Sequence, residues 1–211
     1  MISSSRCLAV AGLAIVLSAC GLVPHQPAPS PDHPASTASA PVPESVSPKV
    51  RAEFSNALAD MRAGRDTEAQ VRLEALAAAN PDLGGLQANL GLVYERAGRL
   101  EDAEKAFKAA VRINPGQPAY YNLLGVFYRG KGDFGQARKA YEAALARNPD
   151  FGAAHLNLGI LFDIYLWEPE KAAVHYQRYA ELTPESEGQV NKWLADLKVR
   201  GTGGRIAKGD K

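Results

Sequence analysis

Residues 90–115 read LGLVYERAGRLEDAEKAFKAAVRINP, and residues 124–149 read LGVFYRGKGDFGQARKAYEAALARNP. The two stretches share Leu-Gly at the start, aromatic and alanine positions in the middle, and Asn-Pro at the end. Each shared position of the second stretch follows its counterpart in the first by the same number of residues, and Pro149 follows Pro115 by that number. A fixed period of about 34 residues is typical of helical hairpins that stack into a solenoid. Because one hairpin cannot bury its apolar face alone, the copies depend on one another for stability.

The pattern extends in both directions from these two copies. Pro81 precedes Pro115 by the same interval and closes an earlier copy whose first helix departs from the pattern, as expected of a terminal repeat that lacks one neighbour. A fourth copy runs from Leu158 to Pro184 and is one residue longer than the others. We expect this extra residue in the turn between its two helices, residues 166–169. The sequence thus predicts four repeats, at about residues 50–83, 84–117, 118–151 and 152–186.

The period and the residue pattern resemble the tetratricopeptide repeat, which implies an all-α solenoid over residues 49–184. Gly91, Gly125 and Gly159 lack a Cβ atom, which allows the two helices of each hairpin to approach closely. Each of these glycines costs about 1 kcal/mol of helix propensity. Aromatic residues fill the gaps between units, and the Asn-Pro pairs close the repeats, because the residue before proline avoids helical geometry.

A last helix is expected over residues 187–200, where Val190, Trp193, Leu194 and Leu197 define one apolar face. Solenoids need an end cap with a polar outer face, so this helix is predicted to cover the last repeat. The alternatives are that it binds a partner, or a second copy of the chain in a homodimer. The glycine-rich and basic residues 201–211 are expected to form a disordered tail.

The first 19 residues are predicted to be a lipoprotein signal peptide. Their apolar stretch, residues 7–17, is too short to span a bilayer as a helix. The tetrapeptide LSAC at residues 17–20 resembles the bacterial lipobox. This resemblance implies cleavage before Cys20 and attachment of acyl chains to its thiol and its amine, and two or more chains hold a protein stably on a membrane. The alternative is an ordinary signal peptide with a chance cysteine.

The residues around Cys20 also indicate a location. Position 21 is glycine, whereas an aspartate there would resemble an inner-membrane retention signal. The sequence therefore favours the outer membrane of a Gram-negative envelope, with the repeats facing the periplasm. Residues 20–48 carry eight of the 14 prolines of the chain among alanine and serine, and are expected to form a disordered tether. Since the other cysteine, Cys7, leaves with the signal peptide, the repeats contain no disulfide.

The charge of the chain is balanced, with 24 Lys and Arg residues against 23 Asp and Glu residues. A nucleic-acid-binding protein normally carries a basic surplus, so this partner class is excluded. The sequence contains no glycine-rich phosphate loop and no recognisable Ser/His/Asp arrangement, and His175 has no metal-ligand partner at helical spacing. We give a structural or surface role to His155 and His175. We therefore expect no enzymatic activity, no cofactor and no metal site.

In the tetratricopeptide family the first helix of each repeat lines a concave surface that binds a protein or peptide. Mapping by position gives an apolar series that recurs in register, beside three asparagines whose amides could bond an extended peptide backbone. The predicted peptide-binding groove comprises Phe54, Leu58, Asn89, Leu92, Arg96, Asn122, Val126, Arg129, Leu156, Asn157 and Ile160. The alternative is that part of this strip packs against neighbouring helices. The lysine-and-asparagine clamp that some family members use for acidic C-termini is not reproduced.

The layout resembles lipid-anchored members of this family, notably the pilotins and pilus-assembly lipoproteins of type IV and Tad-type pilus systems. This resemblance implies a scaffold that helps a pilus or secretion machine to assemble in the outer membrane. The alternative is an adaptor that brings periplasmic hydrolases, proteases or peptidoglycan enzymes together, which the long tether favours.

Overall fold

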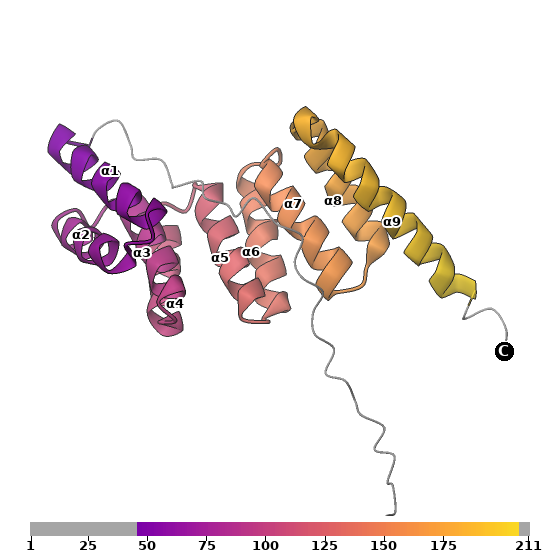
Figure 1. Ribbon diagram of the computed structural model, residues 1–211, viewed down its shortest axis with the longest axis horizontal. Helices are drawn as coiled ribbons and strands as arrows, with labels where there is room; N and C mark the ends of the chain where they lie inside the picture. The colour runs from indigo at the N-terminus through magenta and orange to yellow at the C-terminus, as the bar shows by residue number, and fades with distance from the viewer. Residues whose placement is uncertain (1–45, 207–211) are drawn as a thin grey trace, which may run out of the picture. The chain divides into compact units, whose positions relative to one another are not determined.

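The computed structural model describes residues 46–206, and the side chains of residues 46–200 (Figure 1). The expected signal peptide, Cys20 and the expected tether up to residue 45 lie outside this range. All regular secondary structure of the described residues is helical. The elements are α1 (Pro48–Arg62), α2 (Asp66–Ala79), α3 (Gly84–Arg96), α4 (Leu100–Ile113), α5 (Pro118–Gly130), α6 (Phe134–Arg147), α7 (Gly152–Ile160), the π-helix η1 (Leu161–Tyr165), α8 (Pro169–Leu182), the 3-10 helix η2 (Pro184–Ser186) and α9 (Glu187–Ile206).

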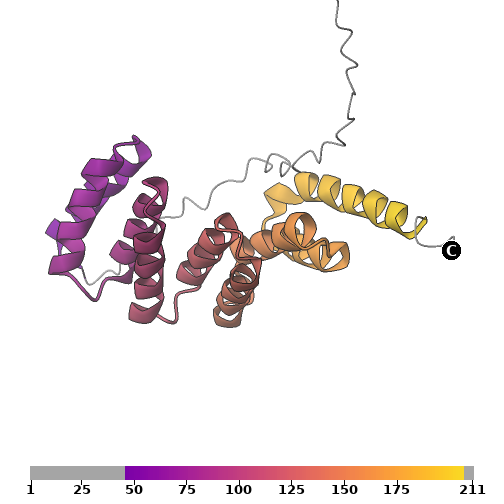
Figure 2. The ribbon, with the colours of Figure 1, turned by 90° about the horizontal axis from the view of Figure 1, so that it is seen from below.

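The helices form four consecutive hairpins, α1–α2, α3–α4, α5–α6 and α7–α8 (Figures 1 and 2). The second helix of each hairpin contacts the first helix of the next one, and α9 packs on α8. The first helices of neighbouring repeats also touch, α3 against α5 and α5 against α7. This arrangement confirms the expected all-α solenoid of helix–turn–helix repeats.

A left-handed glycine ends the first helix in each of the first three repeats. Gly98 has a φ of 72°, and its N–H donates to the Glu95 carbonyl at 3.0 Å. The next N–H, that of Arg99, donates to the Tyr94 carbonyl at 2.8 Å. This pair of bonds is the Schellman motif, which satisfies the last carbonyl groups of a helix. Gly132 takes the same conformation after α5, with a φ of 79°, and glycine adopts it without a Cβ clash.

The fourth repeat ends its first helix with a different left-handed residue. Trp167 occupies the glycine position with a φ of 55°, a conformation that strains the backbone of a bulky residue. The Glu168 N–H donates to the Phe162 carbonyl, six residues back, at 2.8 Å, whereas the closing bond of the third repeat, from Asp133 to Tyr128 at 2.9 Å, reaches back five residues. The turn itself keeps its length, because the non-helical residues between the two helices are 131–133 in the third repeat and 166–168 in the fourth.

The extra residue of the fourth repeat lies before this turn, inside the helix. Residues up to Phe162 keep the regular repeat interval from the third repeat, whereas Trp167 and the residues after it are displaced by one further position. Between them the helix widens into η1, where the Leu166 N–H donates to the Leu161 carbonyl at 3.0 Å. The expectation that the extra residue lies in the inter-helix turn, residues 166–169, is wrong. A π-turn takes up one residue while the backbone hydrogen bonds continue.

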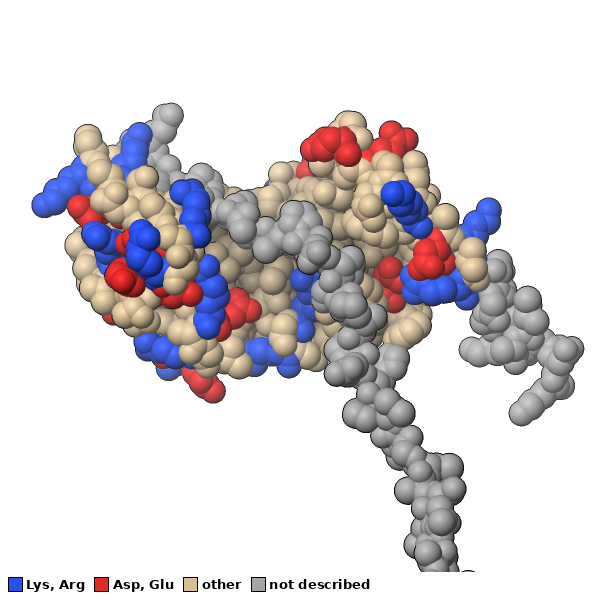
Figure 3. Space-filling view, viewed as in Figure 1, with Lys and Arg blue, Asp and Glu red and all other residues tan. Residues whose placement is uncertain are grey.

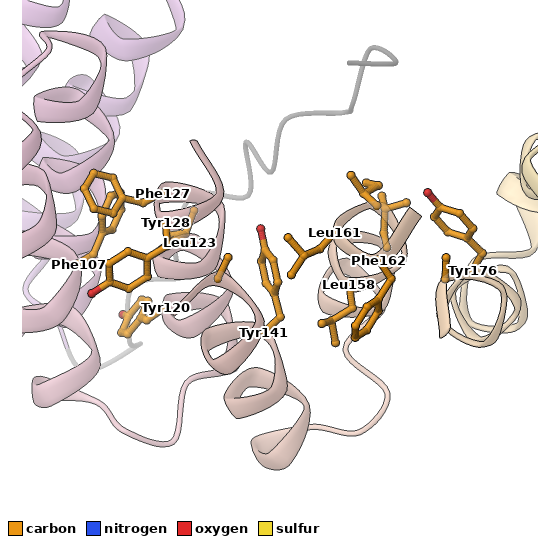
Figure 4. Close-up of a cluster of buried hydrophobic side chains, with 14 of the residues drawn as sticks. Phe107, Tyr120, Leu123, Phe127, Tyr128, Tyr141, Leu158, Leu161, Phe162 and Tyr176 are labelled. Atoms are coloured by element: carbon orange, nitrogen blue, oxygen red, sulfur yellow. The ribbon is translucent and has the colours of Figure 1, made fainter. Parts of the chain in front are cut away.

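An aromatic ring that rests on a glycine joins the two helices of each of the last three hairpins. A Cβ atom added to Gly125 of α5 would lie 2.5 Å from the ring of Tyr141 in α6, too close for any real side chain. The rings concerned lie in the buried core (Figure 4). This geometry confirms that glycine is needed at this position for the helices to approach. The same contact pairs Gly91 with Phe107 and Gly159 with Tyr176.

The first repeat packs the same positions with other residues. Ala57 stands at the glycine position and Leu73 at the aromatic position, and both are fully buried in one cluster. Asp60 replaces the tyrosine, and its carboxylate accepts hydrogen bonds from Arg65 at 2.6 Å and from Arg72 at 2.9 Å. The bond from Arg65 is the main reason that the pKa of Asp60 is lowered. An ion pair therefore joins α1 to α2 where the other repeats use an aromatic residue.

The last helix, α9, begins where it is expected but continues to residue 206, past the expected end at residue 200. Its residues Val190 and Leu197 are buried, and the Trp193 ring lies 5.2 Å from the Tyr176 ring of α8. The apolar face of α9 thus packs on the last hairpin, as expected of a cap. The remainder of the expected tail, residues 207–211, lies outside the described range.

The register of α9 relates it to the first helices of the repeats. Trp167 of the fourth repeat corresponds to Gly132 of the third, and Leu194 follows Gly159 by the same number of residues. Leu194 of α9 therefore corresponds to Gly159 of α7. It is half-buried and packs against the core cluster. A leucine therefore fills the place that the glycine holds in the repeats.

We expect the substitution Gly125→Ala to lower the free energy of unfolding by about 1–3 kcal/mol. Overpacking against Tyr141 costs about this much and outweighs the gain of about 1 kcal/mol in helix propensity. Urea unfolding followed by circular dichroism measures the change.

Two further variants control this experiment. Adding Tyr141→Leu to Gly125→Ala should recover most of the loss, because the pair then matches Ala57 and Leu73. Gly116→Ala is the matched control, since the nearest atom to its added Cβ would be 3.6 Å away. If Gly125→Ala unfolds like the Gly116→Ala control, the glycine–aromatic contact does not set the helix spacing.

Candidate partner-binding face

The residues predicted to bind a partner all lie on α1, α3, α5 and α7, and we call the surface that they share the first-helix face. The contacts of α3 with α5 and of α5 with α7 make this face continuous over repeats 2 to 4. A hydrogen bond from Arg96 to the Met61 carbonyl, at 3.3 Å, joins α3 to α1. The structure therefore brings the predicted residues to the first helices of successive repeats, as the mapping expects.

The apolar members of the first-helix face differ in exposure. Leu58, Leu92 and Val126 are half-buried and reach the surface. Phe54, Leu156 and Ile160 are buried, with exposed fractions of 4%, 8% and 3%. These three residues thus fit the alternative, in which part of the strip packs against neighbouring helices. A partner could reach an apolar strip over the first three repeats.

The three asparagines are buried and bonded within the protein. The Asn157 amide donates to the Asn122 Oδ1 at 2.9 Å, from α7 to α5. The Asn89 amide donates to the Gly85 carbonyl at 2.7 Å. Asn89 and Asn122 are each 1% exposed, and Asn157 is 6% exposed. Their predicted role in bonding a peptide backbone stays a prediction, and it would require these internal bonds to open.

The two predicted arginines have different partners. Arg96 is exposed and pairs with Asp66 of α2 at 2.7 Å. Arg129 is half-buried, and its Nη1 donates to the Asn157 Oδ1 at 3.2 Å. It pairs with no carboxylate among the described residues. Because a guanidinium carries five N–H donors, most of the hydrogen-bonding capacity of Arg129 remains unused.

One residue of this face, Glu95, was missed by the sequence mapping. It precedes Arg129 by one repeat interval and so occupies the same register position, which is the signal that could have identified it. Burial raises the pKa of its carboxyl group. A Cβ atom added to Gly130 of α5 would lie 3.7 Å from its Oε1, so Glu95 reaches the neighbouring repeat at a position without a side chain.

In the fourth repeat the same register position holds Asp163, which is tied to other parts of the chain. Asp163 is 8% exposed, and its Oδ1 lies 2.8 Å from Arg200 of α9. Its Oδ2 accepts a hydrogen bond from the Tyr176 hydroxyl at 3.2 Å. These bonds attach α9 to the end of the first-helix face and leave little of Asp163 for a partner.

The structure also places two histidines next to each other, although their spacing in the sequence does not predict a contact. His155 of α7 and His175 of α8 lie with their Nδ1 atoms 3.1 Å apart, and the Nε2 of His155 lies 2.9 Å from the Pro149 carbonyl. That carbonyl can only accept, so the His155 Nε2 carries a proton and its Nδ1 accepts from His175. Among residues 46–206 no group of three or more His, Cys, Asp or Glu residues is placed to hold a metal ion.

We expect His175 to make the fold sensitive to acid. Burial, with a smaller contribution from His155, lowers the pKa of His175 from 6.5 to about 4. Between pH 4 and pH 6.5 the unfolded chain therefore binds a proton at His175 more readily than the folded chain does. The stability of the fold falls as the pH drops from 6.5 to 4. His175→Gln should reduce the loss of unfolding free energy over this range by about 1–2 kcal/mol. Urea unfolding at several pH values measures it, and an unchanged pH profile would contradict the expectation.

Hairpins of this length, closed by a left-handed glycine and joined by a glycine–aromatic contact, define a class of repeat scaffolds built from stacked helix–turn–helix units. Comparison with protein-family models identifies the family. Two models described as tetratricopeptide repeat match residues 60–126 and 123–187. The chain belongs to the tetratricopeptide repeat family, whose members serve as scaffolds for protein interaction.

Several solved structures share the fold. PilF of Pseudomonas aeruginosa superimposes with a TM-score of 0.65 and 18% identity, over 72% of this chain and 69% of PilF. MamA of Desulfovibrio magneticus RS-1 gives a TM-score of 0.61 and 20% identity, over 77% and 90% of the two chains. An O-GlcNAc transferase of Thermobaculum terrenum gives 0.57 and 22%, over 63% of this chain but 26% of the enzyme. At these identities the likeness shows the fold alone.

A search of curated protein sequences found no match. None of the described helices is long and apolar enough to cross a bilayer.

Proposed function

We propose that the chain is an outer-membrane lipoprotein whose tetratricopeptide repeats face the periplasm and bind a protein partner on the first-helix face. The observation that carries this proposal is the partly exposed apolar strip of Leu58, Leu92 and Val126, which recurs at one position in three successive repeats. Exposed apolar residues in register suit an extended peptide or an amphipathic helix of a partner.

The lipid anchor is supported by the sequence at the start of the chain. LSAC at residues 17–20 provides the cysteine that a diacyl group needs, and the proline-rich residues 20–48 separate it from the repeats. At a polyproline rise of about 3.1 Å per residue, such a segment can extend over roughly 90 Å. The repeats could therefore reach a partner well away from the membrane surface.

We expect Cys20→Ser to abolish the incorporation of labelled palmitate and to move the protein from the membrane fraction to the soluble periplasmic fraction. The lipid is attached through the thiol, which serine lacks. Membrane fractionation and autoradiography of labelled cells provide the measurement. Unchanged labelling and membrane retention of the variant would show that Cys20 is not the anchor.

The pathway that we favour is the assembly of a type IV or Tad-type pilus, or of a secretion machine. The lipid-anchored layout and the fold that the chain shares with PilF support this choice. The second candidate is an adaptor for periplasmic hydrolases, proteases or peptidoglycan enzymes, which the length of the proline-rich segment favours. The identity of the partner distinguishes the two.

A crosslinking pulldown from intact cells tests the proposed surface. We expect the wild type to capture a specific partner and the double variant Leu92→Arg with Val126→Arg to lose it, because two charges would interrupt the apolar strip. The matched control is Val71→Arg with Val174→Arg, since these valines are 61% and 62% exposed on α2 and α8.

The control variant should retain the partner. If the Leu92→Arg/Val126→Arg variant also retains it, the binding surface lies elsewhere on the chain. Capture of a secretin or pilus component supports the first pathway, and capture of a wall enzyme or protease supports the second.

A further inference from the structure

Within the described part of the chain, two charged residues of the first-helix face lack the partners that comparable residues have. Basic and acidic side chains mix on the face seen in Figure 3. Most of the charged side chains of the described helices form ion pairs. Glu95 and Arg129 are exceptions. They occupy the same register position in repeats 2 and 3 and are both half-buried.

We propose that the first-helix face recognises a protein segment that carries one basic and one acidic side chain between apolar residues. Glu95 binds the basic side chain and Arg129 binds the acidic one. This inference rests on the proposed function of the face, and it specifies the charge pattern of the bound segment and which repeat meets each charge.

The case for a basic ligand begins with the isolation of Glu95. Its carboxylate makes no hydrogen bond or ion pair with any residue in the described part of the chain. Every other buried or half-buried carboxylate in that part has at least one such partner. These are Glu53 and Asp60 with Arg72, Asp66 with Arg96, Glu74 with Tyr94, Asp102 with Arg99, Glu104 with Lys108, Asp163 with Arg200 and Glu168 with Lys171.

A partly desolvated carboxylate without a partner is costly. A basic side chain of a bound segment would offset this cost, and the space over Gly130 leaves room for it next to the Glu95 Oε1. The pKa of Glu95, which burial raises in the free protein, would fall on binding.

The case for an acidic ligand rests on a similar comparison of arginines. Three arginines are half-buried among residues 46–200. Arg138 pairs with Glu142 and Arg178 pairs with Asp150, whereas Arg129 bonds only the neutral amide of Asn157. That bond fixes one side of the guanidinium and leaves donors that can bind a carboxylate in two-point geometry.

The two sites are placed so that one segment can occupy both. No ion pair joins Glu95 to Arg129 among the described residues. They stand on α3 and α5, which contact each other, and the axes of helices in contact are commonly about 8–10 Å apart. This distance corresponds to about three residues of extended peptide. Leu92 and Val126 lie one helical turn before them and supply apolar contacts beside the two charges.

Selection from a phage-displayed library of random peptides tests this inference with the full chain as bait. Parallel selections use the wild type, Glu95→Gln, and the Leu92→Arg/Val126→Arg variant. We expect wild-type selections to enrich peptides with Lys or Arg and with Asp or Glu, about two to four residues apart and flanked by apolar residues. The enriched peptides should bind Glu95→Gln about tenfold more weakly.

A peptide in which norleucine replaces the basic residue completes the test. It should bind the wild type and Glu95→Gln equally, because the charge contact is then absent from both complexes. Circular dichroism confirms that the variants are folded.

The outcomes separate this inference from the proposed function. Peptides that require Leu92 and Val126 but show no basic preference, or bind Glu95→Gln as tightly as the wild type, overturn the charge pattern and leave the binding face in place. If no peptide is enriched, or if the enriched peptides bind the Leu92→Arg/Val126→Arg variant equally well, both the face and the charge pattern are overturned.

Discussion

The contact between an aromatic ring and the bare Cα of a glycine sets the spacing of two helices in three of the four hairpins. Gly125 and Tyr141 illustrate it, because no side chain larger than hydrogen fits beneath that ring. The position of the second helix in turn fixes how each hairpin meets the next. The register of the first-helix face follows from this repeated spacing, since Leu92 and Val126 can present one strip only if their hairpins are stacked alike.

Most of the fold could be predicted from the sequence because the residues that determine it are few and strictly spaced. Glycine, aromatic and proline positions recur at one interval, to which the fourth repeat adds a single residue, and each has a local physical reason to be where it is. The extra residue of the fourth repeat could not be located in this way. Counting residues shows that one is added, but whether a turn lengthens or a helix widens depends on backbone hydrogen bonds such as that from Leu166 to Leu161.

The candidate site was predictable in position but not in chemistry. The sequence places the asparagines on the first helices, yet it does not show that Asn157 donates to Asn122 rather than to a ligand. Glu95 shows the opposite case, because its isolation is visible only when the partners of all other carboxylates are known. The pairing of His155 with His175 depends on the packing of two helices, which spacing along one helix does not report.

The leucine at the glycine position of α9 has a consequence for how such an array can change in length. In the repeats a Cβ at this position would collide with the aromatic ring of a second helix, so Leu194 leaves no room for a hairpin partner of the usual kind. A gene duplication that copied one repeat after α9 would place that copy on a surface unable to receive it. Duplications can be accommodated before α9, where the junctions between repeats 2, 3 and 4 each join one glycine-bearing hairpin to another. The helix that ends the array therefore also determines where evolution, or an engineer, can lengthen it.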